Sequence, residues 1–266
     1  MKKNLFIYVC LFLVMGLTVT SCKDDEPTYP IVGKTYDLAQ IEVKDEVPVS
    51  RPDIIVWEST NGIVTAEGQD PAKVIDVFNL ILVSKQIEGA DNYMDALLNS
   101  LRHVSFLEDG NIQAEYCENL TTEKGKWKKS PLGVATYKVL SNNKMRLFLN
   151  LDAIQKTNRS VESALAVLTP IIEDVLTNGI LLTYHLEGDK LSVYLDKEYL
   201  LPILKKLKPI LEDKEIVDLV KGMASSAMPG NEPIINPLIE AIFRDLPGVI
   251  DGTTDLKLGL NLVEKK

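Results

Sequence analysis

Residues that could carry acid–base or metal chemistry are few and scattered in this sequence. It contains two histidines, His103 and His185, and neither lies in an HExxH or CxxC context that would indicate a zinc site. His185 and Glu187 share one face of an alternating segment, so they could form a two-ligand corner or simply a solvated strand face. We therefore expect no metal centre and no cofactor.

The candidate nucleophiles have no partner that the sequence can identify. Ser105 follows His103 by two residues, but a serine triad needs an oriented base, and no G-x-S-x-G turn is present. Cys117 has no base at a recognisable spacing, which favours a small, partly buried residue. The acidic residues are too numerous for the sequence to select a glycosidase pair. These observations favour a non-enzymatic protein, with no catalytic residues to assign.

One basic segment, residues 123–130, stands out in an otherwise acidic chain of net charge −9. Lys126, Lys128 and Lys129 surround Trp127 there. This segment is a candidate for contact with anionic head groups, or with an acidic glycan on which Trp127 stacks; alternatively, it is a loop that lysines keep soluble. The acidic balance argues against nucleic acid as a partner, because phosphates require a basic face.

The elements that would position these residues are mostly antiparallel strands. Segment 33–43 predicts a first strand with Tyr36, Leu38 and Ile41 in the core. Three hairpins follow, with turns at Asp109–Gly110, Asn142–Asn143 and Gly188–Asp189. A last strand over 254–264 alternates leucines with Lys257, Gly259 and Asn261. The residues expected to face inward are Ile112, Ala114 and Tyr116; Met145, Leu147, Leu149 and Leu151; Ile180, Leu182, Tyr184 and Leu186; Leu191, Val193 and Leu195; and Leu256, Leu258, Leu260 and Leu262.

Helices are predicted between and after these strands. Asp70–Pro71 resembles a helix start, with a helix over 72–87. A second helix begins at Asp91 with an apolar stripe that reaches Leu101, and a third spans 160–178 with a kink at Pro170. Segment 197–244 is predicted to be helical with breaks at Pro209 and at 228–233. Its expected core residues are Leu200, Ile203, Leu204, Leu207, Ile216, Val217, Val220, Met223 and Ala224. This order predicts one α+β domain over residues 31–266.

Four segments together resemble calycin-like surface lipoproteins of unknown function from Bacteroidetes-type bacteria. They are GKTYDL at 33–38, FLEDGN at 106–111, GVATYKVLSNNKMRL at 133–147 and YHLEGDKLSVYLDKEYL at 184–200. The resemblance implies an antiparallel, barrel-like sheet with a ligand-sized interior. The inserted helices and those of the C-terminal half are more than such proteins usually carry, so they could cap, fill or replace that cavity.

The N-terminal residues predict where the protein is located in the cell. Lys2 and Lys3 precede an apolar run, residues 5–19, that is too short to span a membrane. Val19 to Cys22 resembles a bacterial lipobox, which implies a signal peptide over 1–21, lipidation of Cys22 and a tether over 22–30. The alternative is an ordinary signal peptide with a chance cysteine. Acyl chains on Cys22 would make outer-membrane lipid the first partner.

The four residues after Cys22 are charged: Lys23, Asp24, Asp25 and Glu26. They resemble the export signal that sends Bacteroidetes-type lipoproteins to the cell surface; alternatively, they only keep the tether solvated. We therefore expect a lipid-anchored outer-membrane protein exposed at the cell surface.

Three functions remain open from the sequence. The first is binding of an apolar or amphipathic small molecule inside the sheet. The second is an interaction role, as an accessory subunit of an outer-membrane assembly with a filled core. The third, glycan binding or hydrolysis, has no motif behind it. An interior cavity of a few hundred Å³ would favour the first, and a packed interior with an apolar surface patch the second.

Overall fold

The described residues form two compact units. The computed structural model describes residues 29–44, 47–66, 68–78, 98–117, 127–150, 175, 177–227 and 230–266. The first unit, called here the sheet unit, comprises Met1–Ile54, Lys85–Leu195 and Gly259–Lys266; the second, the helix unit, comprises Ile55–Ser84 and Asp196–Leu258. Among the described residues, no helix is long and apolar enough to cross a membrane.

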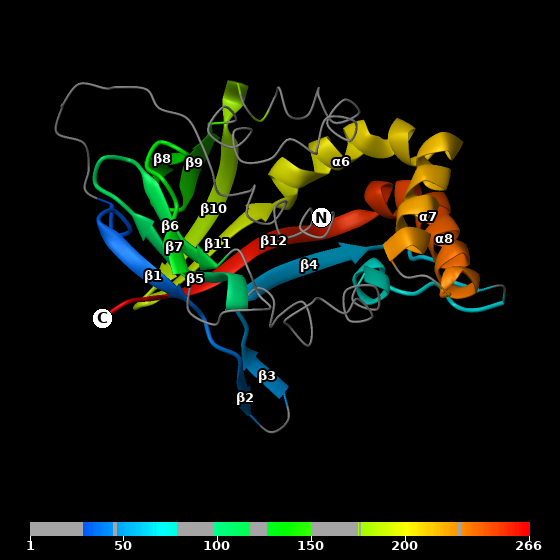
Figure 1. Cartoon of the computed structure of the whole chain (residues 1–266), viewed down its shortest axis with the longest axis horizontal. Helices are drawn as coiled ribbons and strands as arrows, with labels where there is room; N and C mark the ends of the chain where they lie inside the picture. Colours follow the sequence, from blue (N-terminus) through cyan, green and yellow to red (C-terminus); the bar gives the residue numbers. More distant parts are fainter. Residues whose placement is uncertain are drawn as a thin grey trace. The chain divides into compact units, whose positions relative to one another are not determined.

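The sheet unit is an antiparallel sheet curled into a half-barrel (Figure 1). The strand order is β7-β6-β5-β1-β12-β11-β10-β9-β8, and β4 also pairs with β12, while β2 and β3 form a separate ribbon. Residues 55–59 of β4 and 253–258 of β12 fall within the helix unit. The strands are β1 (Lys34–Leu38), β2 (Glu42–Lys44), β3 (Val47–Ser50), β4 (Asp53–Ser59), β5 (Leu101–Phe106), β6 (Ile112–Cys117), β7 (Trp127–Lys129), β8 (Ala135–Ser141), β9 (Lys144–Leu149), β10 (Ile180–Glu187), β11 (Lys190–Asp196) and β12 (Thr253–Glu264). This arrangement confirms the predicted antiparallel α+β class at the level of a curled sheet with helices.

The predicted hairpins are present. β5–β6, β8–β9 and β10–β11 pair in antiparallel register around the expected turns. The first turn is longer than the two-residue type that Asp109–Gly110 suggests, because β5 ends at Phe106 and β6 begins at Ile112. Gly110 takes the left-handed conformation there, with φ of 81°.

Of the predicted core residues of the first strand, two are buried and one is not. Tyr36 and Leu38 are buried as expected, but Ile41 is 44% exposed. The inward placement of Ile41 is wrong because β1 ends at Leu38, so the alternation does not continue to residue 41. Leu151 lies outside the described residues.

Side chains pack the inside of the half-barrel. The largest of its fully buried side chains are Tyr36, Tyr184, Ile31, Met145, Leu147 and Leu191. The ring of Phe106 meets Tyr36 edge-on at 6.0 Å between centroids and Tyr137 at 5.2 Å. Because β1 and β5 lie on one side of the sheet order and β8 lies at its far end, this aromatic row crosses the interior.

The β5–β6 turn binds β8 and so brings the two ends of the sheet together. Tyr137 donates its backbone N–H to Gly110 O at 2.7 Å and its hydroxyl to Leu107 O at 2.9 Å. The side chain of Asn111 accepts from the N–H of Gly133 at 2.8 Å. These bonds fix the curl, because they join segments that are not neighbours in the strand order.

The helix unit contains α6 (Lys197–Leu211), α7 (Lys214–Ala227) and α8 (Glu232–Asp251). Its core joins Ile242, Val249 and Ile250 of α8 to Ile63 and Val77. Near the end of β4, Ser59 and Asn61 donate to the carbonyl oxygens of residues 249 and 248 at 2.9 and 2.7 Å. Gly248 O also accepts the backbone N–H of Gly252, and Val249 O also accepts the Thr253 hydroxyl, so these side chains add to the hydrogen bonds at the last turn of α8.

Several helix predictions require correction. Ala72 pairs with Ile63 in an isolated β-bridge, and helix begins only at Val74, so the predicted start at Asp70–Pro71 is wrong. The N–H of Ala72 donates to Ile63 O at 2.9 Å and is therefore not available to a helix cap. Leu101 opens strand β5 instead of closing a helical stripe.

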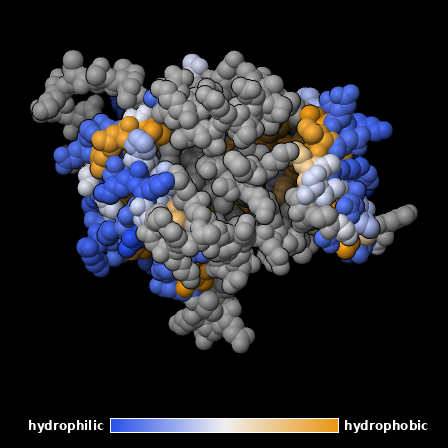
Figure 2. All heavy atoms as spheres, in the orientation of Figure 1, coloured by the Kyte–Doolittle hydropathy of each residue, from blue (hydrophilic) through white to orange (hydrophobic). Residues whose placement is uncertain are grey.

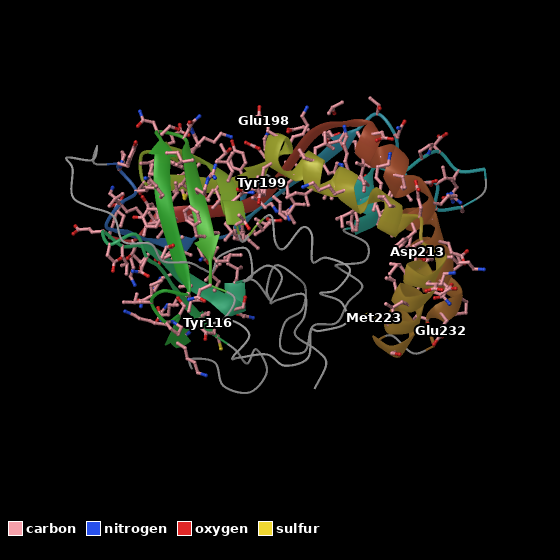
Figure 3. All side chains as sticks on the ribbon, turned by 90° about the horizontal axis from the view of Figure 1, so that it is seen from above. Tyr116, Glu198, Tyr199, Asp213, Met223 and Glu232 are labelled. Carbon is pink, nitrogen blue, oxygen red and sulfur yellow. The ribbon has the colours of Figure 1, made fainter. Side chains whose placement is uncertain are left out.

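The C-terminal helices also differ from expectation. Pro209 lies inside α6, and the helix ends only at Leu211, so the predicted break at Pro209 is two residues early. Met223 on α7 is 55% exposed, so its placement in the core is wrong (Figure 3). Of the helix predicted to begin at Asp91 with a stripe reaching Leu101, residues 98–100 are helical and residues 91–97 lie outside the described residues. Most of the helices predicted over 72–87 and 160–178 also lie outside them.

Gly259 illustrates a position that the fold restricts to glycine. A Cβ atom on Gly259 would lie 2.1 Å from Val193 O, a backbone atom that cannot move away cheaply. We expect Gly259→Ala to destabilise the protein by about 2–3 kcal/mol through this overlap. Gly222→Ala is the matched control, because Gly222 lies within α7 with open space around it and alanine favours a helix. Urea denaturation measures both; equal stabilities would contradict the close approach.

Two buried tyrosines should respond in opposite ways to loss of the hydroxyl. The hydroxyl of Tyr137 is bonded to Leu107 O, whereas the buried hydroxyl of Tyr36 has no hydrogen-bond partner among the described residues. Tyr137→Phe should cost about 1 kcal/mol in the free energy of unfolding, and Tyr36→Phe should cost nothing or add up to about 1 kcal/mol. A Tyr36→Phe loss equal to that of Tyr137→Phe would contradict the assignment.

The buried hydroxyl of Tyr36 also predicts how the stability of the protein depends on pH. Burial, with Glu264 and Tyr184 nearby, raises the pKa of Tyr36 to about 12 from its ordinary value near 10. The unfolded chain therefore loses this proton first, and the stability from neutral Tyr36 falls between about pH 10 and pH 12. Tyr36→Phe should lose stability less steeply over that range.

Candidate functional site

An open cavity of about 530 Å³ lies on the outer face of the sheet unit, over β1, β5, β6 and the end of β12. Such a volume is within the range of small-molecule sites. Its lining residues are Thr35, His103, Ser105, Gln113, Glu115, Lys129, Lys265 and Lys266. Side chains alternate along a strand, so Thr35, Ser105 and Gln113 face outward while Tyr36, Val104 and Ala114 are buried.

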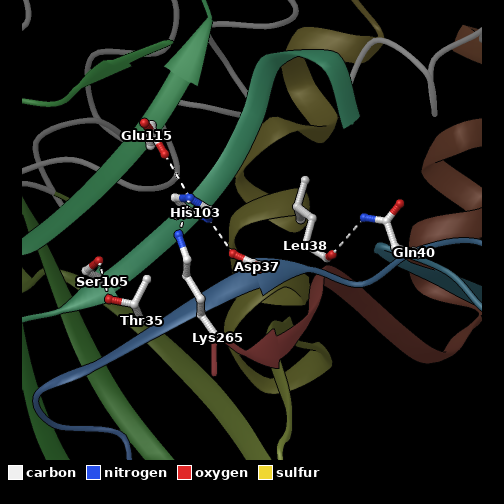
Figure 4. A network of polar contacts seen from close by, with 8 residues as sticks. All are labelled: Thr35, Asp37, Leu38, Gln40, His103, Ser105, Glu115 and Lys265. Carbon is white, nitrogen blue, oxygen red and sulfur yellow. Dashed lines mark hydrogen bonds and ion pairs between the residues drawn. The ribbon is translucent and has the colours of Figure 1, made fainter. Parts of the chain in front are cut away.

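His103 is the centre of a polar network in this cavity (Figure 4). The strand register places Asp37 on β1 and Glu115 on β6 directly opposite His103 on β5. His103 Nδ1 contacts Asp37 Oδ1, and His103 Nε2 lies 2.9 Å from Glu115 Oε2. Lys265 Nζ lies 2.7 Å from the same Nε2. The histidine side chain is only 13% exposed, so neighbouring groups hold the ring.

The two contacts at Nε2 require different protonation states of His103. An ammonium group only donates, so the bond from Lys265 needs an unprotonated Nε2 and leaves the ring proton on Nδ1, facing Asp37. The contact with Glu115 as a hydrogen bond needs a proton on Nε2.

The hydroxyl groups beside His103 are paired with each other and not with the ring. Thr35 Oγ1 and Ser105 Oγ are 2.8 Å apart. The Ser105 hydroxyl therefore bonds to a threonine, and the ring nitrogens of His103 face charged groups. In the described part of the chain, no three His, Cys, Asp or Glu side chains are grouped to hold a metal ion.

The predicted basic segment lies next to this cavity and contributes one residue to it. Lys129 lines the cavity and pairs in register with Glu115, while Trp127 pairs with Cys117. The ring of Trp127 is covered by Arg102, whose Cζ lies 5.7 Å from the ring centroid. Lys128 belongs to β7 but does not line the cavity.

The other candidate residues are not brought into the site. His185 is exposed on β10 opposite Ser192, and Glu187 pairs with Lys190. Cys117 is buried, in agreement with the sequence interpretation. The predictions for Lys126, for lipidation at Cys22 and for the export signal at 23–26 lie outside the described residues.

The sequence missed Asp37, Glu115 and Lys265 as partners of His103. Asp37 is 66 residues from His103, and Lys265 is 162 residues away. Alternation alone places His103 and Ser105 on one face of their strand, but only the pairing of β5 with β1 and β6 shows which acids they meet.

A second open cavity, of about 450 Å³, lies in the helix unit. Trp57, Asn61 and Lys73 are among its lining residues. Lys73 is paired with Glu58 at 3.1 Å, and Asn61 bonds the end of α8. Its main polar groups therefore serve the fold, and it is the weaker candidate.

Comparison of the chain with protein-family models, with curated proteins and with solved structures gives no match.

The His103 network should stabilise the sheet, because it joins three strands and the residue after β12. We expect His103→Ala to lower the free energy of unfolding by about 1–2 kcal/mol, through loss of hydrogen bonds to charged groups. His185→Ala is the matched control, since His185 is an exposed histidine of the same sheet, and it should change stability by less than about 0.5 kcal/mol. Urea denaturation distinguishes them; equal effects would show that the network contributes nothing.

Proposed function

We propose that this protein is a non-enzymatic, lipid-anchored protein of the outer-membrane surface that binds its ligand on the outer face of the half-barrel, at the cavity around His103. One observation carries this proposal. Large side chains, among them Tyr36, Tyr184 and Met145, occupy the inside of the half-barrel, while the cavity of about 530 Å³ lies on its outer face. The polar lining suits a hydrophilic ligand.

The fold and the address belong to the same proposal. The curled antiparallel sheet is compatible with a calycin-like fold, which the resemblance of four segments first suggested. Lipidation at Cys22 and export through residues 23–26 rest on the sequence. The absence of catalysis is supported by the pairing of Ser105 with Thr35 and by the charged partners on the ring nitrogens of His103.

An apolar ligand inside the sheet is the second candidate. The buried hydroxyl of Tyr36 favours it, because this polar atom has no partner among the described residues and a ligand or water could supply one. Such a ligand would have to displace packed side chains. A retained mass in native mass spectrometry of the protein released from its own membranes would support this candidate over binding on the outer face.

An interaction role in an outer-membrane assembly is the third candidate. Leu219 and Met223 of α7 and Ile234 of α8 are more than half exposed. The coloured surface in Figure 2 is mostly hydrophilic, with small hydrophobic areas. Co-purification of a stoichiometric envelope protein, lost on substitution of these three residues, would support this role.

The proposed anchor is testable in cells of a bacterium with this export route. Cys22→Ser should abolish incorporation of a labelled fatty acid and release the protein from the membrane fraction, because acyl chains supply the membrane affinity. Replacement of Asp24, Asp25 and Glu26 by alanine should keep the lipid but remove access to protease added outside intact cells. Protease resistance of the unaltered protein in intact cells, with digestion after lysis, would contradict surface exposure.

A further inference from the structure

We infer that the cavity around His103 binds an acidic saccharide, meaning a sugar that carries a carboxylate or a sulfate group. This inference rests on the proposed function and extends it by naming the ligand class. It follows from three features of the lining: its charge, its polar groups and its width.

The charge of the cavity is opposite to that of the chain. Its lining has three lysines and one carboxylate, in a protein whose net charge is −9. Lys129 is exposed on β7 and lies opposite Glu115 in the strand register. Glu115, the acid of the lining, faces His103 at 2.9 Å. Arg102, stacked on Trp127, adds another cation beside β7. Lys266 is paired with Asp189 at 3.4 Å, so an anionic group in the cavity would meet chiefly the ammonium groups of Lys129 and Lys265.

The remaining polar groups suit sugar hydroxyls. Thr35 and Ser105 present two hydroxyls that both donate and accept, Gln113 presents an amide, and Glu115 presents carboxylate oxygens that accept. None of the eight lining residues is apolar. A lipid surface would need apolar side chains to bury beside the lysines, so the lining favours a saccharide over an anionic membrane.

The width of the site exceeds that of an inorganic anion. Lys129 lies on β7, and Lys265 follows β12 and reaches over β1 to His103 on β5. Two strand spacings separate β7 from β5, about 10 Å in all. A ligand that meets Lys129 at one side and Lys265 or Lys266 at the other must therefore be extended, as a disaccharide is.

The test measures binding by calorimetry to the mature, lipidated protein in a non-ionic detergent. The probes are a sulfated, uronate-containing disaccharide, a neutral disaccharide, inorganic sulfate and phosphatidylglycerol vesicles. We expect the acidic disaccharide to bind with a dissociation constant on the order of 1 mM, which is typical of a weak site. The neutral disaccharide should show no binding at that concentration. Lys129→Gln should weaken binding about tenfold. Lys138→Gln is the matched control, because Lys138 is exposed on β8 and outside the lining, and it should leave affinity unchanged.

Each other outcome overturns a stated part of the inference. Equal binding of the neutral disaccharide contradicts the role of charge, and inorganic sulfate that binds as tightly as the disaccharide contradicts the role of the sugar. Binding only to vesicles indicates a lipid surface instead. If no probe binds while the anchor tests succeed, the ligand class is wrong but the proposed surface protein stands. An apolar molecule retained in native mass spectrometry would instead contradict binding on the outer face.

Discussion

The contact between Tyr137 and the β5–β6 turn is the constraint on which the sheet unit depends. β8 is the last strand in the sheet order, yet Tyr137 bonds backbone atoms of Leu107 and Gly110 near its other end. A sheet open at both ends would leave its apolar face exposed and its edges unpaired. The contact curls the sheet, so that Tyr36, Phe106 and Tyr137 pack against one another inside.

This curl also decides which residues are available for binding. Strand alternation puts every second side chain of β1, β5 and β6 on the convex side once its neighbours are committed to the interior. Thr35, His103 and Glu115 therefore lie together outside because Tyr36, Val104 and Ala114 lie inside. The packing of the core and the polar cavity are two consequences of the same register.

Local signals in the sequence were sufficient for hairpins and insufficient for the site. Turn residues and alternation predicted β8–β9 and β10–β11 correctly, because both strands of each pair are adjacent in the chain. Ala72 was misplaced because its bridge to Ile63 depends on tertiary structure, and Met223 because the exposure of its face of α7 does too. The network of His103 could not be predicted from local sequence either, because its partner Lys265 is 162 residues away.

The position of β1 links the proposed anchor to the proposed site. If Cys22 carries the lipid, the eight tether residues that follow it reach at most about 28 Å before the globular part begins. β1 is the first strand after that tether and supplies Thr35 to the cavity and Asp37 to its histidine. A site so close to its anchor would stay near the membrane surface. Such a site would best bind saccharides held at the cell envelope. Both partners would then be confined to the same surface, and confinement raises their effective concentration. Weak binding through lysines and hydroxyls would therefore suffice.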